Sequence, residues 1–328
     1  MMKVIAFSVR PEERPFFETY AKELGIDIEI TGEHPTMETV DKAKGADAIS
    51  IITTPIDARL ISAFHDRGIR YISTRTIGFE HIDLEAAKAK GIGVGNVGYS
   101  PYSVAEYTIM LMLMCLRKMK QIQQRAAIQD FTLPGTTGTE LHDKTVGVIG
   151  TGRMGRTVVS ILKGFGCAIL ANDIHRDSEV AKSVSYVSLN ELLKSSDIIT
   201  LHVPATNTDS PLLGKEQFAM MKDKTVLINT ARGSLIDQDA LIAAIERGKI
   251  GAAALDVVQN EKKLYYDDCK GMPISDRQLL LLRSYPNVII TPHMAFHTQQ
   301  AIEEMVKNSL ASCKAATIGQ GRTPRKDR

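Results

Sequence analysis

The stretch TVGVIGTGRMG, residues 145–155, decides the fold class of this chain. Its apolar, β-branched start predicts a buried strand, and Gly150, Gly152 and Gly155 then form a G-x-G-x-x-G turn. A helix is expected after the turn, at 156–163. A strand, a glycine-rich turn and a helix in this order are typical of the first βα unit of a dinucleotide-binding domain.

An acidic residue at a defined distance makes the motif more specific. Asp173 lies 21 residues after Gly152, close to the roughly 20-residue spacing of the fingerprint. Its carboxylate would accept hydrogen bonds from the adenosine ribose and repel a 2′-phosphate, so NAD is favoured over NADP, although Arg176 nearby works against that preference. The phosphates would lie against the turn and the helix start, with Arg153 and Met154 among the expected contacts. The alternative is a structural turn that binds nothing.

Composition indicates an ordinary globular protein of about two domains. The 328 residues are 44% apolar and 24% charged, and a net charge of +2 gives no argument for nucleic acid or an anionic membrane surface. Four scattered cysteines without a C-x-x-C pair indicate reduced thiols in a cytosolic protein. No metal site is expected, since the eight histidines lack metal-binding spacings. No apolar run is long enough to suggest a signal peptide or a membrane span, so the expected location is cytoplasmic.

Short β-rich runs alternate with helical patterns over the first hundred residues, which predicts a parallel sheet with crossover helices. The expected strands here are 4–9, 26–30, 48–52, 71–74 and 93–97, and the expected helices are 11–23, 36–43, 57–66 and 83–90. This series contains no glycine-rich phosphate turn. It is therefore interpreted as a substrate domain.

A second alternating series begins at Thr145 and contains the fingerprint. Its expected strands are 146–149, 168–173, 184–187, 198–203, 226–230, 252–257 and 288–291, and its expected helices are 189–195, 215–221 and 238–247. A long helix at 104–124, with a methionine stripe typical of a core or a subunit interface, precedes it. The last helix, 298–317, has no strand after it, and the basic tail at 321–328 is expected to be a solvated end.

Three polar side chains near strand ends of the second series suggest hydride-transfer chemistry, because ligands of open α/β sheets bind at those ends. Arg232 would pair with a substrate carboxylate and polarise the neighbouring carbonyl with its planar fork. His293 would protonate the oxygen as hydride reaches carbon. Glu261 would hold the imidazole in one orientation and favour its charged form. Each residue alone has a simpler structural explanation: Arg232 as a surface arginine, His293 as a hydrogen-bonded structural histidine and Glu261 as a solvated charge. Together the three indicate a site.

The sequence resembles the D-isomer-specific 2-hydroxyacid dehydrogenases, and within them the D-lactate dehydrogenases. The matching stretches are STRTIGFEHID (73–83), GNVGYSPYSVAEYT (95–108), VGVIGTGRMG (146–155), SDIITLHVP (196–204), INTARGSLID (228–237), GAAALDV (251–257) and NVIITPHMAF (287–296). Two of these segments, with YYDDC (265–269), are most like the D-lactate dehydrogenases of vancomycin-resistance operons.

The resemblance implies an α/β fold of two doubly wound, parallel-sheet, Rossmann-like domains with a cleft between them. It implies a discontinuous substrate domain, residues 1–100 and 298–328, around an NAD-binding domain at 101–297. It also implies a homodimer built on the long helix after Ser100, and a small 2-keto or 2-hydroxy acid as the substrate.

The resemblance carries roles to particular residues of this chain. Arg232, Glu261 and His293 match the catalytic Arg, Glu and His of the family. The expected substrate contacts are the backbone N–H groups of Ile77 and Gly78 and the aromatic side chains of Tyr99 and Phe296. The expected cofactor contacts, besides the glycine-rich turn and Asp173, are His202, Val203, Pro204, Thr230, Ala231, Arg232 and Asp256.

One departure from the family pattern affects Glu261. The family usually reads D-V-x-E-x-E, whereas this chain reads Asp256-Val257-Val258-Gln259-Asn260-Glu261. Asn tolerates a positive φ better than most residues, so the loop is expected to keep its path.

Three functions remain open from the sequence. The first is NADH-dependent reduction of pyruvate to D-lactate. The second keeps this chemistry for a bulkier acid such as phenylpyruvate or 2-ketoisocaproate, because a motif does not reveal pocket size. The third is an NAD(H)-sensing regulator, which measurable turnover would exclude.

Overall fold

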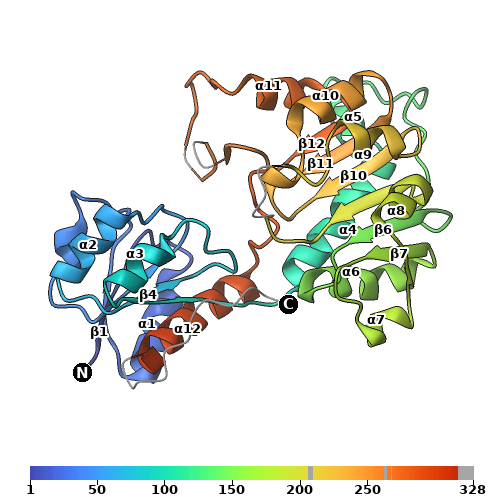
Figure 1. Cartoon of the computed structure of the whole chain (residues 1–328). Coiled ribbons are helices and arrows are strands. Elements are labelled where there is room, and N and C mark those ends of the chain that lie inside the picture. Colours follow the sequence, from blue (N-terminus) through green and yellow to red (C-terminus); the bar gives the residue numbers. More distant parts are fainter. Residues whose placement is uncertain (206–209, 262–263, 267, 317–328) are drawn as a thin grey trace. The chain divides into compact units, whose positions relative to one another are not determined.

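The computed structural model describes residues 1–205, 210–261, 264–266 and 268–316. The chain divides into two compact units, residues Met1–Ser100 with His297–Arg328 (unit 1) and residues Pro101–Phe296 (unit 2) (Figure 1). The solvated end expected at 321–328 lies outside the described residues. Each unit is an α/β layer structure with its own parallel sheet.

Unit 1 is built on a five-stranded parallel sheet of order β2-β1-β3-β4-β5. Its strands are β1 (Lys3–Ala6), β2 (Asp27–Ile30), β3 (Ala48–Ile51), β4 (Tyr71–Thr74) and β5 (Gly93–Asn96). Its helices are α1 (Arg14–Leu24), the 3₁₀ turn η1 (Val40–Ala43), α2 (Ala58–Asp66), α3 (Leu84–Ala89) and α12 (Gln299–Ala315). The crossover helices form because Asp57 and Asp83 accept hydrogen bonds from backbone N–H groups at the starts of α2 and α3.

The last helix, α12, belongs to unit 1 although it follows unit 2 in the sequence. Val306, Leu310 and Cys313 on α12 are buried in one core with Val4 of β1 and Phe17 of α1. Figure 1 shows α12 beside α1 on one face of the sheet. The chain therefore leaves unit 1 once and returns to it.

Unit 2 is built on a seven-stranded parallel sheet of order β12-β11-β10-β9-β6-β7-β8. Its strands are β6 (Thr145–Ile149), β7 (Ala168–Asn172), β8 (Ser185–Tyr186), β9 (Ile198–Leu201), β10 (Thr225–Asn229), β11 (Ile250–Leu255) and β12 (Val288–Ile290). Its helices are α4 (Tyr102–Leu116), α5 (Met119–Ala127), α6 (Arg153–Leu162), α7 (Ser178–Ala181), α8 (Leu189–Ser195), α9 (Lys215–Met220), α10 (Gln238–Glu246) and α11 (Arg277–Ser284), with 3₁₀ turns η2 (Lys163–Phe165) and η3 (Gly233–Leu235).

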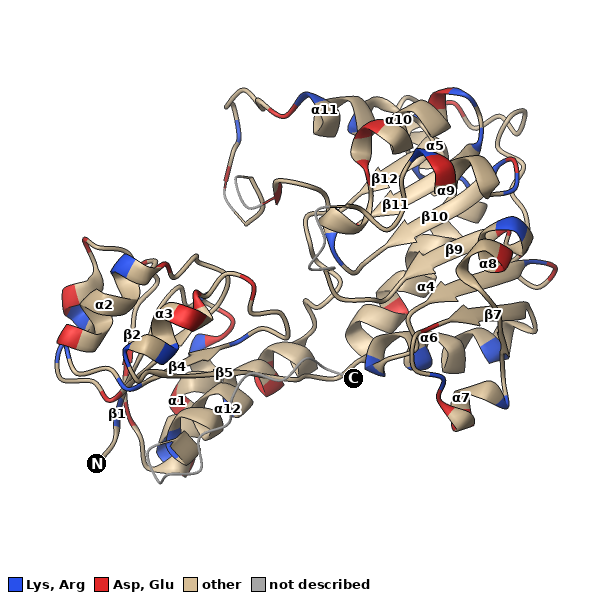
Figure 2. Ribbon diagram, viewed as in Figure 1, with Lys and Arg blue, Asp and Glu red and all other residues tan. Residues whose placement is uncertain are grey.

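The predicted fold class is confirmed, because both sheets are parallel and wound with helices. Each expected strand has a counterpart in the structure, within a few residues at its ends. The central strands β3, β4, β9 and β10 are buried along their whole length, as their continuous apolar or β-branched sequences predict. Figure 2 shows acidic and basic residues interspersed on helices and loops in each unit, which fits the small net charge.

Three helix predictions need correction. The single helix expected at 104–124 is two helices, because Lys118 adopts a left-handed conformation with φ 52° that ends α4 before α5 begins. The helix expected at 36–43 is only the short 3₁₀ turn η1, and α6 begins at Arg153 rather than Arg156. Among the described residues, no helix is long and apolar enough to cross a membrane.

Candidate active site

The carboxyl edge of the unit 2 sheet, where its strands end, brings the predicted catalytic residues to neighbouring positions. Arg232 follows β10, Asp256 follows β11 and His293 follows β12, and these three strands are adjacent in the sheet. Adjacent strands lie about 4.8 Å apart, so the three segments form one continuous edge. The backbone hydrogen bonding between β11 and β12 continues past the ends of both strands, since the His293 N–H donates to the Asp256 carbonyl at 2.8 Å.

His293 and Glu261 are paired directly. His293 Nδ1 lies 2.7 Å from Glu261 Oε1, and both side chains are partly buried. The other carboxylate oxygen, Oε2, accepts the N–H of Val258 at 2.9 Å, which fixes the carboxylate against its own loop. Asn260 has φ 59°, so it does adopt the left-handed conformation that the sequence allows it. With Nδ1 held by Glu261, Nε2 of the imidazole is the nitrogen left for a substrate.

Asp256 holds the loop that carries His293. Its side chain is fully buried, and Oδ1 accepts the Thr291 hydroxyl at 2.5 Å and the Met294 N–H at 2.8 Å. Oδ2 accepts the Ala295 N–H at 2.9 Å. Burial raises the pKa of Asp256, and the hydrogen bonds from Thr291, Ala295 and Met294 act in the opposite direction. His293 itself has φ 53°, a strained conformation for a non-glycine residue, and these bonds on both sides of it stabilise that conformation.

Two aromatic rings border the imidazole of His293. The Phe296 ring stands edge-on to it, with centroids 6.3 Å apart. The Tyr266 ring lies 6.2 Å from it, and the Tyr266 hydroxyl donates to the His293 carbonyl at 3.1 Å. Tyr266 was not singled out from the sequence as a site residue. The sequence does place Tyr266 five residues after Glu261, in the quoted YYDDC stretch, and this position could have indicated a site residue.

Arg232 sits on a short, well-held turn. Asn229 accepts the Ala231 N–H at 3.0 Å and donates its amide to the Arg232 carbonyl at 2.9 Å. Within the guanidinium, Nη1 donates to the Ala231 carbonyl at 2.8 Å. The Thr230 hydroxyl is shared with Thr108 of α4 at 2.9 Å. The turn is thus fixed to both the sheet and the helix behind it, while the guanidinium has five N–H donors in all.

The glycine-rich turn after β6 is packed so closely that it requires its glycines. Gly150 has φ 93°, and a Cβ there would lie 2.5 Å from the His202 carbonyl oxygen. A Cβ on Gly155 would lie 1.9 Å from the Gly150 carbonyl oxygen. Gly152 is the N-cap of α6, whose first residues are Arg153 and Met154. A helix N-terminus without a capping side chain offers its N–H groups to a phosphate, so the residues present fit a dinucleotide.

Asp173 lies one residue beyond β7, beside the same turn. Its Oδ2 accepts the N–H of Thr151 at 2.6 Å, and its Oδ1 accepts the N–H of His175 at 2.8 Å. Oδ2 also accepts the Thr151 hydroxyl at 3.1 Å, so the lone pair left for a ribose hydroxyl is on Oδ1. The Arg176 guanidinium lies over the Tyr186 ring, 5.9 Å from its centroid.

The segment His202-Val203-Pro204 follows β9, next to the glycine-rich turn. His202 continues the strand ladder by donating its N–H to the Ile149 carbonyl at 2.7 Å, and its Nε2 lies 2.9 Å from the Thr200 hydroxyl. Burial lowers the pKa of His202 to about 4, so its imidazole is neutral at physiological pH. A methyl of Val203 lies 2.7 Å from where a Gly150 Cβ would be, which adds to the close packing.

The carboxyl edge of the unit 1 sheet carries the predicted carboxylate-binding loop. After β4, the Thr76 hydroxyl donates to the Gly78 carbonyl at 2.5 Å, and the Asn96 amide donates to the Ile77 carbonyl at 2.7 Å. Among the described residues, neither the Ile77 nor the Gly78 N–H has a hydrogen-bond acceptor. Tyr99 lies three residues beyond β5, in the same unit. Holding both carbonyls leaves two backbone donors available to an anion.

Within the described residues there is no cluster of His, Cys, Asp and Glu side chains suited to a metal ion. Three other histidines contact neighbours in their own unit or solvent. His81 Nε2 lies 3.1 Å from the Thr74 hydroxyl, and His142 Nδ1 lies 2.9 Å from the Phe165 carbonyl. His65 is exposed on α2.

Comparison with known proteins agrees with this geometry. The model of the NAD-binding domain of D-isomer specific 2-hydroxyacid dehydrogenases matches residues 109–295. A D-specific alpha-keto acid dehydrogenase of Enterococcus faecium is 41% identical over 94% of this chain and 95% of its own length. A D-lactate dehydrogenase of Lactiplantibacillus plantarum is 39% identical over 95% of this chain and 96% of its own, and an aromatic 2-oxoacid reductase of Clostridium sporogenes is 39% identical over 94% of each.

A solved structure shows the same fold. TP0037 of Treponema pallidum, described as a D-lactate dehydrogenase, has a TM-score of 0.89 and 32% identity over 98% of each chain. The chain belongs to the D-isomer specific 2-hydroxyacid dehydrogenase family. The prediction that its glycine-rich turn lies in an NAD-binding domain is confirmed.

Proposed function

We propose that this enzyme reduces a small 2-keto acid to the D-2-hydroxy acid with NADH, and that pyruvate, giving D-lactate, is its main substrate. The single observation that carries the proposal is the 2.7 Å contact of His293 Nδ1 with Glu261 at the carboxyl edge of the NAD-binding sheet. A carboxylate behind an imidazole orients it and stabilises its charged form, as a general acid requires. The D-lactate dehydrogenases among its relatives support pyruvate.

Each proposed residue has one role. NADH, when bound, supplies the hydride to the keto carbon. His293 gives the proton from Nε2 to the keto oxygen, and Glu261 stabilises the imidazolium before that transfer. Arg232 pairs with the substrate carboxylate and polarises the carbonyl. The N–H groups of Ile77 and Gly78 bind the same carboxylate.

The remaining site residues fall into two groups. Tyr99 and Phe296 line the substrate pocket. The residues that would hold NAD are Gly150, Gly152, Arg153, Met154, Gly155, Asp173, His202, Val203, Pro204, Thr230, Ala231, Arg232 and Asp256. In this proposal Asp256 acts through the loop of residues 291–295, because its buried oxygens are bonded to that loop. Residues 101–297 then form the NAD-binding domain, and residues 1–100 with 298–328 the substrate domain.

We also propose a homodimer built on α4 and α5. An apolar groove of about 590 Å³ runs between α4, α5 and α6, lined by Met110, Leu113, Met114, Ile122, Ile161 and Phe165. Met112 of the methionine stripe is buried in the core, whereas Met110 is 40% exposed. A second copy covers this groove, which removes exposed apolar surface from water. The four cysteines are free, which fits the reducing cytoplasm as the compartment.

A bulkier 2-keto acid is the second candidate. The observation that favours it is the pair of aromatic rings beside His293, since Tyr266 is 42% exposed and lies edge-on to Phe296 with centroids 6.5 Å apart. Aromatic side chains recognise aromatic groups by edge-to-face packing. The relative from Clostridium sporogenes is named for aromatic 2-oxoacids.

The test is NADH oxidation by the purified protein across 2-keto acids from pyruvate to phenylpyruvate, with the His293→Ala variant assayed in parallel. Turnover that ranks the acids and is lost in the variant supports the enzyme and sets the size of the pocket. NADH binding without reduction of any 2-keto acid overturns the catalytic proposal and favours a sensor of NAD(H). Analytical ultracentrifugation of the wild type and Met110→Lys tests the dimer.

A further inference from the structure

Arg75 is a charged side chain in a place where charge is costly. It follows β4 in unit 1 and is fully buried, and its partner Glu13 is 1% exposed. Nε of Arg75 donates to Glu13 Oε1 at 3.1 Å. Removing two charges from water costs desolvation free energy, and only an ion pair with excellent hydrogen-bond geometry offsets that cost. A buried ion pair next to a candidate site therefore needs a reason.

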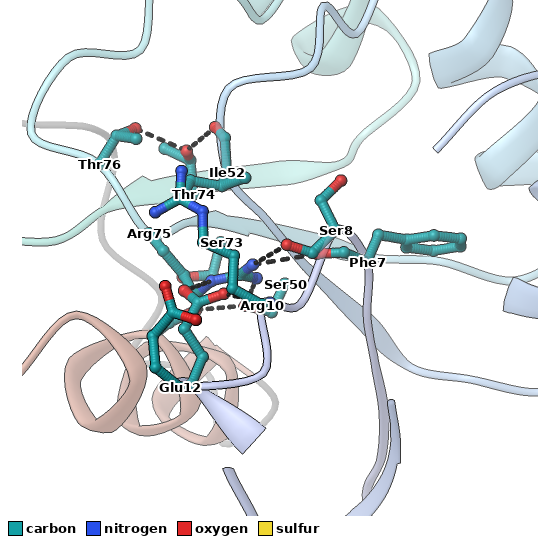
Figure 3. A network of polar contacts seen from close by, with 12 residues as sticks. Phe7, Ser8, Arg10, Glu12, Ser50, Ile52, Ser73, Thr74, Arg75 and Thr76 are labelled. Atoms are coloured by element: carbon teal, nitrogen blue, oxygen red, sulfur yellow. Dashed lines mark hydrogen bonds and ion pairs between the residues drawn. The ribbon is translucent and has the colours of Figure 1, made fainter. Parts of the chain in front are cut away.

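The guanidinium connects several elements of unit 1 at once. Nη2 donates to the carbonyls of Phe7 and Ser8 at 3.0 and 3.2 Å, just past the end of β1, and Nη1 donates to the Ser50 hydroxyl of β3 at 3.1 Å. Figure 3 shows these contacts converging on one side chain. The ring of Phe17, on α1, lies 5.1 Å from Cζ. Arg75 thus fixes β4 to β1, β3 and α1.

The residues on either side of Arg75 lead directly to the carboxylate-binding loop. The Arg75 N–H donates to the Ile51 carbonyl at 2.8 Å, and the Thr76 carbonyl accepts the Val97 N–H at 3.1 Å, so both residues continue the hydrogen bonding of the sheet. Thr74 and Thr76 share a hydroxyl hydrogen bond of 2.7 Å, and Thr76 also donates to the Gly78 carbonyl. Side chains alternate between the faces of a strand. Arg75 therefore anchors the chain from one face, and the two threonines shape the loop from the other.

We propose that Arg75, paired with Glu13, is a positioning residue that sets the direction of the Ile77 and Gly78 N–H groups for the substrate carboxylate. Because it is fully buried, it acts through the backbone and touches no substrate. The inference rests on the proposed function, in which those two N–H groups bind the carboxylate. The ligand that these two N–H groups would bind is a 2-keto or 2-hydroxy monocarboxylate.

The main test uses the double variant Glu13→Gln/Arg75→Met, which removes both charges and so leaves no unpaired charge in the core. The probes are pyruvate and oxamate, a carboxylate that mimics pyruvate and is not reduced. We expect KM for pyruvate and Kd for oxamate in the presence of NADH to rise about tenfold. The reason is that the N–H groups of Ile77 and Gly78 would no longer point at the carboxylate and would bind it more weakly. The value of kcat should change by less than about threefold, and the affinity for NADH alone should stay unchanged.

Arg75→Lys is the second variant, in case the double variant does not fold. Lys keeps the charge near Glu13 but lacks the planar fork that reaches Phe7, Ser8 and Ser50 together. Arg75→Lys should raise KM for pyruvate and Kd for oxamate about threefold to fivefold, and kcat should again change little. Tyr71→Phe is the matched control, since it removes a 2.8 Å hydrogen bond to Ser312 at the opposite end of the same strand. It should leave both constants as in the wild type.

The outcomes separate the two levels of inference. If the wild type neither reduces any 2-keto acid nor binds oxamate, the proposed function fails. If the wild type reduces pyruvate and the folded double variant or Arg75→Lys keeps wild-type KM and oxamate affinity, the positioning role is overturned. A loss of kcat and of NADH affinity in parallel with KM overturns it as well, because that pattern reports a general disturbance of the fold.

Discussion

The carboxyl edges of the two sheets follow the same topology and present opposite kinds of chemistry. In unit 2 the strands end in ionisable side chains, and the His293–Glu261 pair is open enough to exchange a proton. In unit 1 the loop after β4 offers the Thr76 hydroxyl and the backbone amides of Ile77 and Gly78, and the charged pair, Arg75 with Glu13, is buried in the interior. The charged pair of unit 2 is partly exposed, whereas that of unit 1 is shielded from water.

This difference shows that a parallel sheet fixes where a site lies without deciding its chemistry. Proton transfer needs a group whose charge can change during the reaction. Recognition of a carboxylate that stays charged throughout needs donors that do not move. In the proposed function, the residues after the strands of unit 2 transfer the proton and those after β4 of unit 1 bind the carboxylate.

The largest expected effect comes from removing the proton donor. His293→Ala should lower kcat/KM by about 10²- to 10⁴-fold, the usual contribution of general acid–base catalysis. NADH affinity should stay close to wild type, because the dinucleotide turn is untouched. Stopped-flow hydride transfer and NADH fluorescence titration measure the two quantities. Retention of more than a tenth of wild-type activity would remove His293 from the mechanism.

The next effect concerns the support of that donor. Asp256→Asn should lower the stability of unit 2 by about 1–3 kcal/mol, because an amide NH₂ would face the Ala295 N–H that now donates to Oδ2. The His293 loop should loosen and kcat should fall with it. Urea denaturation followed by hydrogen exchange in unit 2 measures the loss. Asp237→Asn is the control, since Asn caps α10 as well as the present Asp; equal losses in the two variants would contradict the role given to Asp256.

A smaller effect is expected at the carboxyl edge of the unit 1 sheet. Thr76→Val keeps the shape of the side chain and removes the hydroxyl that donates to the Gly78 carbonyl. The variant also loses the 2.7 Å contact with the Thr74 hydroxyl. Each lost hydrogen bond is worth about 1 kcal/mol, so KM for pyruvate should rise by at least about fivefold while kcat changes little. Thr19→Val is the control, because its hydroxyl donates to the Pro15 carbonyl on α1, away from the edge. A pH-dependent change in KM would show that this edge also handles protons.

The strands were predictable from sequence because they are buried along most of their length, and burial on both faces imposes continuous apolar runs. The helices were harder to predict from the sequence. The break between α4 and α5 depends on Lys118 in a left-handed conformation, which no glycine or proline announces. The helix α7 has only four residues, and the unpredicted α11 carries four consecutive leucines, so neither shows the apolar periodicity of a helix.

Within the candidate site, the sequence predicts the residues next to strand ends and also the pairing of Glu261 with His293, 32 positions apart. The loop between them, turned at Asn260, brings Glu261 Oε1 to His293 Nδ1. Tyr266 and Arg75 lie in the quoted stretches YYDDC and STRTIGFEHID, but the sequence does not show what their side chains contact. Arg75 in particular is 62 residues from Glu13, so only the folded sheet reveals their pairing.

The smallest expected effect is a pH dependence confined to unit 2. Burial lowers the pKa of His202 to about 4, whereas an unfolded histidine titrates near 6.5. Below about pH 6.5 the unfolded state therefore binds a proton that the folded state does not, so stability falls as pH falls, by about 0.7 kcal/mol between pH 7 and pH 6. His202→Gln should remove this slope.

Thr200→Val separates the causes of the slope, because it deletes the hydroxyl beside Nε2 and leaves the partly buried imidazole in place. If burial sets the slope, Thr200→Val keeps it. Hydrogen exchange resolved by unit is the right measurement, since a protein of two units need not unfold in one step. His202 lies in unit 2, so the part of the slope that His202→Gln removes should be lost from unit 2 alone. An equal loss of slope in both units would contradict the assignment of the slope to His202.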